Sequence, residues 1–210
     1  MQNVKGKSNP DDGHGHGTHV AGIVGAIDNE IGSVGVAQGC ELVAVRVLDN
    51  NGYGVLSDII AGVDYVAKFA SAGDVANMSI GMSASNTLDA AITAAAAKGI
   101  FFSVAAGNSA ADAQNYSPAR LNTTHVFTVS AMDNNDAWAS FSNYGPAVDY
   151  CEPGVDVYST WINSGYNNLS GTSMAAPHLA GILLVTGGKP NTSGQVQYDP
   201  DNVADPIGHL

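Results

Sequence analysis

A serine at the start of an expected helix is well placed to act as a nucleophile. Residues 171–178 read Gly-Thr-Ser-Met-Ala-Ala-Pro-His, and the small residues around Ser173 let other backbone segments approach its hydroxyl. In a first helical turn the N–H of Ser173 has no helical partner, so one residue can supply both an attacking oxygen and an oxyanion donor. An isolated Gly-Thr-Ser would more commonly be a plain helix N-cap. The length of the motif favours the chemical interpretation.

Three histidines lie close together in residues 13–22, which read Gly-His-Gly-His-Gly-Thr-His-Val-Ala-Gly. A neutral imidazole in the first turn of a helix can take the proton of a serine and return it to a leaving amine. His14, His16 and His19 could instead bind zinc, but their spacing lacks the His-Glu-x-x-His pattern of a helical zinc site. A structural role is the other alternative, which we favour for His14 and His19.

An asparagine follows an expected strand in residues 105–109, Ala-Ala-Gly-Asn-Ser. This places Asn108 just past the carboxyl end of the strand, where open parallel sheets bind ligands. Its amide can donate to a developing oxyanion, although an asparagine beside a glycine is also a common turn residue. For this motif alone the turn role is the more common of the two.

Together the three motifs resemble the subtilisin-like serine proteases, over nearly the whole chain. Residues 112–118 and 141–145 are most similar to the proteinase K-like branch. The resemblance implies that His16 is the general base, that His19 supports it, that Ser173 is the nucleophile and that Asn108 is the oxyanion donor. It also implies a secreted or extracellular protein that acts on protein or peptide substrates.

The resemblance assigns further residues to substrate binding and to calcium. Gly52, Tyr53 and Gly54 resemble the edge that pairs with substrate backbone, so that substrate would add as a strand. The pocket walls are expected from Ser79, Ile80 and Gly81 together with Ala106 and Gly107. Structural calcium is expected at Ile27, Asn29, Ile31 and Ser33, and a second cation at Asp149. No organic cofactor is implied.

The acid of the family's catalytic triad has no counterpart that we can identify. The family carries it in an Asp-Ser-Gly or Asp-Thr-Gly turn after an early strand, whereas only fifteen residues precede His16. Asp11 and Asp12 resemble the loop that leads into the histidine motif and lie too close to His16 in sequence to orient its ring. We therefore expect an N-terminally truncated domain with impaired turnover, and a monomer unless another chain supplies the missing segment.

A catalytically silent pseudoprotease that binds peptides along residues 51–54 is the main alternative to an enzyme. Retention of the serine, histidine and asparagine argues against it, and the absent acid argues for it. A zinc-binding module built on the three histidines is a third interpretation.

Alternating apolar runs and amphipathic stretches must position these residues. We expect strands at 42–48, 75–80, 100–105 and 125–131, and helices at 55–70, 87–98 and 172–185. The order predicts one α/β domain over residues 1–210, in which a mainly parallel sheet lies between two helical layers. Short strands and turns are expected in 141–160, and a loop-rich end in 186–210.

Composition excludes several classes of partner. The formal charge of −12 repels nucleic acid and anionic membrane surfaces, and no apolar run is long enough to span a bilayer. The polar start from Met1 to Asp12 carries no secretion signal. Two cysteines are too few for a disulfide framework, so one bridge, one reactive thiol or two buried thiols remain open; we favour the buried thiols.

Overall fold

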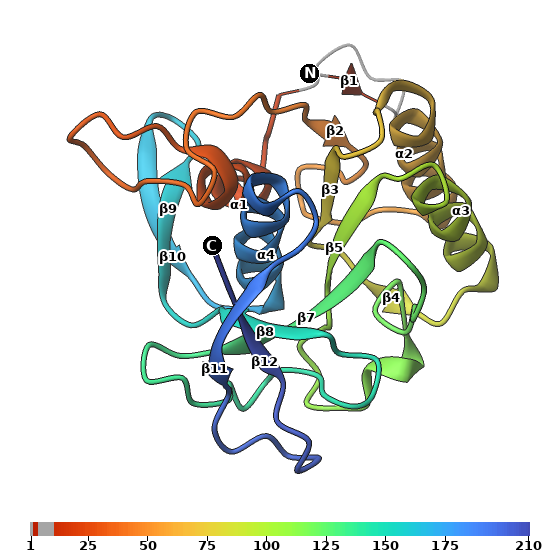
Figure 1. Cartoon of the computed structure of the whole chain (residues 1–210). Helices are drawn as coiled ribbons and strands as arrows, with labels where there is room; N and C mark the ends of the chain where they lie inside the picture. The colour runs from red at the N-terminus through yellow and green to blue at the C-terminus, as the bar shows by residue number, and fades with distance from the viewer. Residues whose placement is uncertain (1, 4–10) are drawn as a thin grey trace.

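The computed structural model describes residues 2–3 and 11–210 and folds them into three layers (Figure 1). The helices are α1 (His16–Gly25), α2 (Leu56–Phe69), α3 (Asn86–Ala96) and α4 (Thr172–Thr186), with a short 3-10 helix at Ala113–Asn115. The strands are β1 (Gln2–Asn3), β2 (Val45–Arg46), β3 (Val75–Met78), β4 (Met82–Ser83), β5 (Phe101–Ala105), β6 (Tyr116–Ser117), β7 (Val126–Met132), β8 (Tyr150–Pro153), β9 (Val157–Trp161), β10 (Gly165–Leu169), β11 (Asn191–Gln195) and β12 (Pro206–His209).

A six-stranded sheet forms the middle layer, in the order β11-β12-β8-β7-β5-β3. Its pairs are parallel except for the antiparallel pair of β11 with β12. The pair β5–β7 aligns Val104 with Thr128, so these strands end at the same edge of the sheet. This arrangement confirms the predicted α/β fold and brings the carboxyl ends of β3 and β5 side by side.

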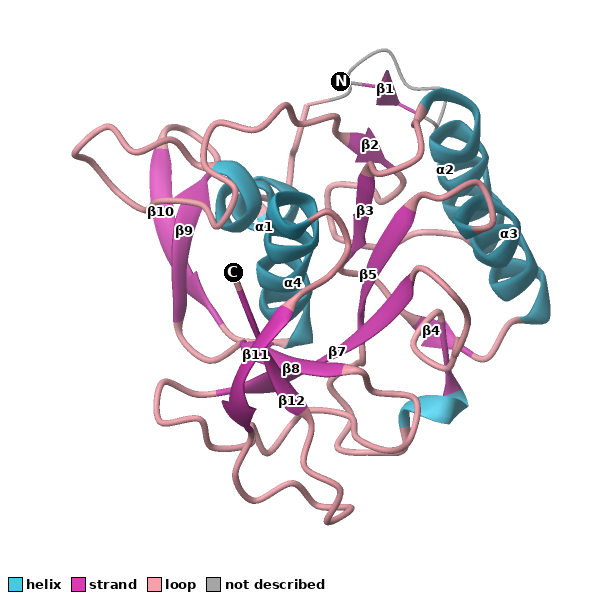
Figure 2. Ribbon diagram, in the orientation of Figure 1, coloured by secondary structure: helices cyan, strands magenta, loops and turns pink. Residues whose placement is uncertain are grey.

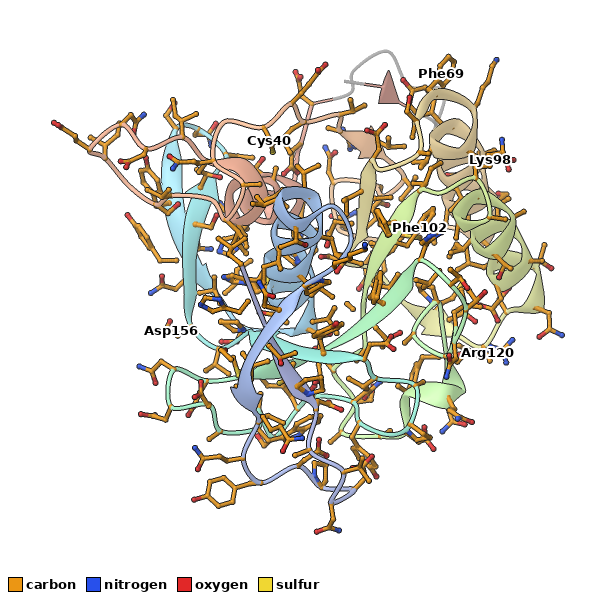
Figure 3. All side chains as sticks on the ribbon, in the orientation of Figure 1. Cys40, Phe69, Lys98, Phe102, Arg120 and Asp156 are labelled. Carbon is orange, nitrogen blue, oxygen red and sulfur yellow. The ribbon has the colours of Figure 1, made fainter. Side chains whose placement is uncertain are left out.

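Helices cover both faces of the sheet (Figure 2). On one face α2 and α3 pack their apolar stripes on β5, and Figure 3 shows Phe102 between that strand and the two helices. On the other face α4 buries Leu179 and Leu183 against Val129 of β7. Helix α1 lies beside α4 in this second layer. Because α4 is apolar nearly all round, it is fixed between α1 and the sheet.

Three sequence predictions need correction. Only Val45–Arg46 of the run 42–48 is a strand, and it pairs with β1 rather than with the main sheet. Leu42 and Val43 precede this strand and are exposed, whereas Val47, which follows it, packs on the core beside α2. Strand β10, which pairs antiparallel with β9, was not expected.

The third correction concerns the loop-rich end expected at 186–210. This segment contains β11 and β12, and β12 joins the main sheet beside β8. The carboxylate of Glu152 accepts a hydrogen bond from the N–H of Gly208 at 3.0 Å, inside the protein. The close packing needs a glycine, because a Cβ at position 208 would lie 2.2 Å from that carboxylate.

The two cysteines and the first residues of the chain were also the subject of sequence predictions. Both cysteines are free; Cys151 is buried, as expected, whereas Cys40 is only half-buried. No helix in the described part of the chain combines the length and apolar character needed to cross a bilayer. The polar start at Met1 to Asp12 falls mostly on residues 1 and 4–10, which lie outside the described residues.

Candidate active site

The hydroxyl of Ser173 lies in the first turn of α4 and is half-buried. Its Oγ donates to the carbonyl oxygen of Ser79 at 3.3 Å, and the hydroxyl of Ser79 donates to the carbonyl oxygen of Ser173 at 2.7 Å. These reciprocal bonds join the nucleophile candidate to the segment that follows β3. The predicted pocket residue Ser79 therefore contacts the predicted nucleophile directly.

Thr172, which precedes Ser173 in the sequence, fixes the amide of Asn108 at the start of α4. The Oδ1 of Asn108 accepts hydrogen bonds from the N–H of Thr172 at 2.8 Å and from its hydroxyl at 2.9 Å. Because both donors bind the oxygen, the NH₂ group of Asn108 remains free to donate elsewhere. A Cβ at Gly171 would lie 3.4 Å from this Nδ2, so a glycine keeps open the space before the amide.

Thr172 is a site residue that the sequence reasoning missed. It is buried, and its Oγ1 also accepts the N–H of Gly107 at 3.0 Å, while it donates to Asn108. Gly107 has φ 107°, and a Cβ there would lie 2.3 Å from the amide of Asn143. The signal was present in the sequence as the hydroxyl residue that precedes the serine in Gly-Thr-Ser.

His16 is the first residue of α1 and follows Gly15, whose φ of 107° ends the preceding turn. The indole of Trp161 packs over Gly15, and a Cβ there would lie 2.4 Å from it. Burial lowers the pKa of His16, and the neighbouring His14 and His19 lower it further, whereas Asp12 raises it. The ring is therefore neutral at pH 7, as a proton acceptor requires.

The imidazole of His16 and the hydroxyl of Ser173 belong to adjacent helices, because α1 packs against α4. Within residues 11–210 no hydrogen bond joins the two groups, and the hydroxyl of Ser173 donates to Ser79 instead. Their pairing as base and nucleophile stays a prediction.

The other two histidines differ in their surroundings. His19 is buried, and its Nε2 lies 3.0 Å from the carbonyl oxygens of both Val157 and Asn167. Since carbonyls only accept, Nε2 carries the proton, and His19 fastens α1 to β9 and β10. His14 is exposed, and its ring centroid lies 6.4 Å from that of His16. Among the described residues no group of three or more His, Cys, Asp or Glu could hold a metal ion, so the zinc module finds no support.

Asp12 caps the turn that leads into α1 and does not orient the imidazole of His16. Its carboxylate accepts the backbone N–H groups of His14, Gly15 and Thr18 and the hydroxyl of Thr18, at 2.7–2.9 Å. Burial raises the pKa of Asp12, but these hydrogen bonds outweigh it and lower the pKa to about 2. Among the described residues no carboxylate hydrogen-bonds to His16.

The predicted substrate edge is an exposed turn held by Asp49. The Oδ1 of Asp49 accepts the N–H groups of Asn51 and Tyr53, both at 2.9 Å. Gly52 has φ 79° and faces the ring of His14, because a Cβ built at Gly52 would lie 3.6 Å from the Nε2 of His14. Of the predicted pocket residues, Ser79 and Gly107 join the network of Ser173 and Asn108, while Ala106 is buried and accepts the amide of Asn143.

The remaining predicted pocket and edge residues lie beside these groups. Gly54 faces Leu48 in the turn after β2. A Cβ built at Gly81 would lie 3.8 Å from the carbonyl oxygen of Ser117. Ile80 is half-buried and packs against the core between the sheet and the helices α2 and α3.

The predicted calcium loop offers few side-chain ligands. Ile27 and Ile31 are exposed and can give only backbone carbonyls. The Oδ1 of Asn29 accepts the N–H of Ile31 at 3.4 Å, and the hydroxyl of Ser33 is buried without a partner. These oxygens are of the hard type that calcium prefers.

Asp149 lies in a different place, at a hollow of about 450 Å³ that is also lined by Phe101, Phe127 and Lys189. Burial raises the pKa of Asp149 to about 6, against a hydrogen bond from the N–H of Thr128. Lys189 would repel a cation in the same hollow. Because Phe101 begins β5 whereas Asn108 follows its end, the hollow lies at the opposite edge of the sheet from Ser173.

Comparisons with known proteins agree on one family. A profile described as "Subtilase family" matches residues 2–201. The chain is 49% identical over 183 residues to alkaline serine exoprotease A of Vibrio alginolyticus, covering 87% of this chain and 33% of that protein. It is 44% identical over 187 residues to proteinase T of Parengyodontium album, covering 87% of this chain and 61% of that protein.

A solved structure gives the same result. A cold-adapted subtilisin-like serine proteinase superposes with a TM-score of 0.88 at 40% identity, covering 97% of this chain and 77% of that one. Subtilisin BL of Lederbergia lenta is 42% identical over 208 residues, covering 98% of this chain and 76% of that protein. The chain thus spans between a third and about three quarters of the length of these proteins.

Proposed function

Because the chain belongs to the subtilase family, we propose that it is a serine-type endopeptidase whose nucleophile is Ser173. The observation that carries the proposal is the fixed amide of Asn108. Its oxygen is bound twice by Thr172, and its Nδ2 and the backbone nitrogen of Ser173 lie 3.4 Å and 3.7 Å from the same point, the Cβ position at Gly171. Two donors at one point are what an oxyanion would need.

The proposed reaction proceeds through an acyl-enzyme. The hydroxyl oxygen of Ser173 attacks the substrate carbonyl carbon while its proton passes to His16, which is neutral at pH 7. The N–H of Ser173 and the amide of Asn108 stabilise the oxyanion. When the tetrahedral intermediate collapses, the C–N bond breaks and the amine leaves with the proton from His16. Water then attacks the acyl ester by the same route in reverse.

We propose that turnover by this chain is slow. No described carboxylate hydrogen-bonds to the imidazole of His16, so none fixes its tautomer, and the charge of Asp12 favours the protonated form less than burial disfavours it. The resting hydrogen bond from Ser173 to Ser79 favours the second candidate, a peptide-binding protein without activity. Binding of substrate would have to break that bond before the hydroxyl reaches His16.

A fluorophosphonate probe separates the two candidates. We expect slow labelling of the folded chain that is absent in Ser173→Ala, reduced strongly in His16→Ala, and reduced in Asn108→Ala by about 100-fold or more. Circular dichroism of each variant provides the folding control. A folded chain that takes up no probe would refute the endopeptidase and leave the peptide-binding protein.

The remaining parts of the proposal rest on the family resemblance. We propose a protein or peptide substrate bound as an added strand along residues 52–54, structural calcium at the loop 27–33, and an extracellular site of action. Asp149 is a weaker cation candidate because of Lys189. We also propose a monomer, which light scattering measures.

A further inference from the structure

A proline in α4 leaves the carbonyl of Ser173 without its helical partner. In an α-helix the carbonyl of residue 173 would accept the N–H of residue 177, but that residue is Pro177, which has no N–H. The pyrrolidine ring also crowds the carbonyl of the residue four positions earlier. The peptide unit that carries the candidate nucleophile is therefore the one that the helix itself does not fix.

The hydroxyl of Ser79 replaces the missing donor. It donates to the carbonyl oxygen of Ser173 at 2.7 Å and is itself buried. This bond crosses 94 positions of sequence and ties the start of α4 to the segment after β3. Without this donor the half-buried carbonyl would lose its hydrogen bond within the protein.

Asn77 sets the direction of that hydroxyl. Its Nδ2 donates to the Oγ of Ser79 at 3.0 Å, and a hydroxyl that accepts on its oxygen has one proton left to donate. That proton points to Ser173. The Oδ1 of Asn77 is buried without a partner, so the amide keeps this orientation at the cost of an unpaired oxygen. Rotating the amide would turn Oδ1 towards Ser79 and draw the proton away from Ser173.

We propose that Asn77 and Ser79 are positioning residues for the nucleophile, acting as a relay that substitutes for the hydrogen bond removed by Pro177. The relay fixes the carbonyl of Ser173, and with it the direction in which the Oγ leaves the helix. This inference deepens the proposed function and rests on Ser173 being the nucleophile. Neither residue touches the reacting atoms through its side chain.

The direct test measures the second-order rate of Ser173 labelling by a fluorophosphonate. Ser79→Ala should slow labelling by about 3- to 10-fold, the effect of one net hydrogen bond. Asn77→Asp has no N–H to donate and attracts the hydroxyl proton of Ser79, so it should slow labelling as Ser79→Ala does. Asn122→Asp, at the remote hollow, adds the same charge and serves as the control.

A compensating substitution distinguishes positioning from a general loss of packing. Pro177→Ala restores an N–H at the position where the carbonyl of Ser173 can accept it. Pro177→Ala should therefore raise the labelling rate and the free energy of unfolding more in the Ser79→Ala background than in the native background. A double-mutant cycle on the free energy of unfolding measures this coupling without any need for activity.

The outcomes are separable. A folded native chain that is not labelled refutes the proposed function, and the unfolding cycle then decides the relay alone. Labelling of Ser79→Ala at the native rate, or additive effects of Ser79→Ala and Pro177→Ala on unfolding, would overturn the relay whether or not the chain is an enzyme.

Discussion

Replacement of Glu152 by glutamine should make the protein lose less stability at alkaline pH. Glu152 lies in β8 with 2% of its surface exposed, and its Oε1 accepts the N–H of Gly208 in β12. Burial raises the pKa of Glu152 from 4.5 to about 8, against this hydrogen bond, which lowers it. At neutral pH the native protein therefore holds a proton that the unfolded chain releases.

Proton linkage gives the direction and the magnitude of the change in stability that Glu152 causes as the pH rises. The stabilisation from the protonated carboxyl is complete below about pH 4.5 and is lost as the pH rises through about 8. Each pH unit in this window costs about 1.4 kcal/mol, so about 4 kcal/mol is lost between pH 5 and pH 9. For a chain of this length that corresponds to a melting temperature lower by about 10 °C.

Thermal unfolding of the native chain and of Glu152→Gln at pH 5 and pH 9 measures this difference. The amide still accepts the N–H of Gly208 but does not ionise, so the variant should gain about 4 kcal/mol relative to the native chain between the two pH values. Asp205 and Asp149 titrate in both proteins and cancel in the comparison. Glu41→Gln, at an exposed position, is the control. An equal gap in melting temperature at pH 5 and pH 9 would refute the reasoning.

Four further predictions concern the site and its supports. Asp12→Ala should lower the unfolding free energy at pH 7 by about 1–2 kcal/mol, because the turn before α1 loses its cap. This deficit should shrink as the pH falls from about 4 to about 2, since the native carboxylate, with a pKa of about 2, then becomes protonated. Denaturant titration at pH 7 and pH 2.5, with Asp64→Ala as control, measures both effects. Thr172→Val removes the hydroxyl that binds Asn108 and Gly107, so labelling by the fluorophosphonate should slow by about 5- to 10-fold at unchanged circular dichroism; an unchanged rate contradicts the role of Thr172. His19→Leu leaves the carbonyls of Val157 and Asn167 without their donor and should cost about 1–3 kcal/mol in thermal unfolding, whereas a neutral result would mean that His19 is not a support. Removal of calcium by a chelator should lower the melting temperature and calcium should restore it; Asn29→Ala should weaken the response, and a chelator without effect would end the calcium proposal.

The places of the candidate site residues at the ends of helices and strands were predictable from the sequence because each residue follows a local signal. Ser173 and His16 begin helices after glycine turns, and Asn108 follows a buried strand. Such positions depend on a few neighbouring residues and on the edge at which parallel strands end. The parallel sheet and its two helical layers were predictable for the same reason, from the alternation of apolar runs with amphipathic stretches.

The features that escaped prediction depend on contacts between distant segments. Strand β12 contains a proline and a glycine, and its place in the sheet depends on the bond between Gly208 and Glu152, 56 positions apart. The apolar run at 42–48 was expected to be a buried strand, but only its second half packs on the core beside α2, through Val47, while Leu42 and Val43 are exposed. The tie between Ser79 and Ser173 likewise appears only when β3 and α4 are placed side by side.

Formation of an acyl-enzyme on Ser173 tests the central claim most directly. The folded chain is mixed with a peptide nitrophenyl ester and quenched with acid at a series of times from seconds to hours, and its intact mass and proteolytic fragments are measured. We expect one acyl group per chain, on the fragment that contains Ser173, and none in Ser173→Ala. A folded chain that carries no acyl group, or one acylated equally after Ser173→Ala, would contradict it.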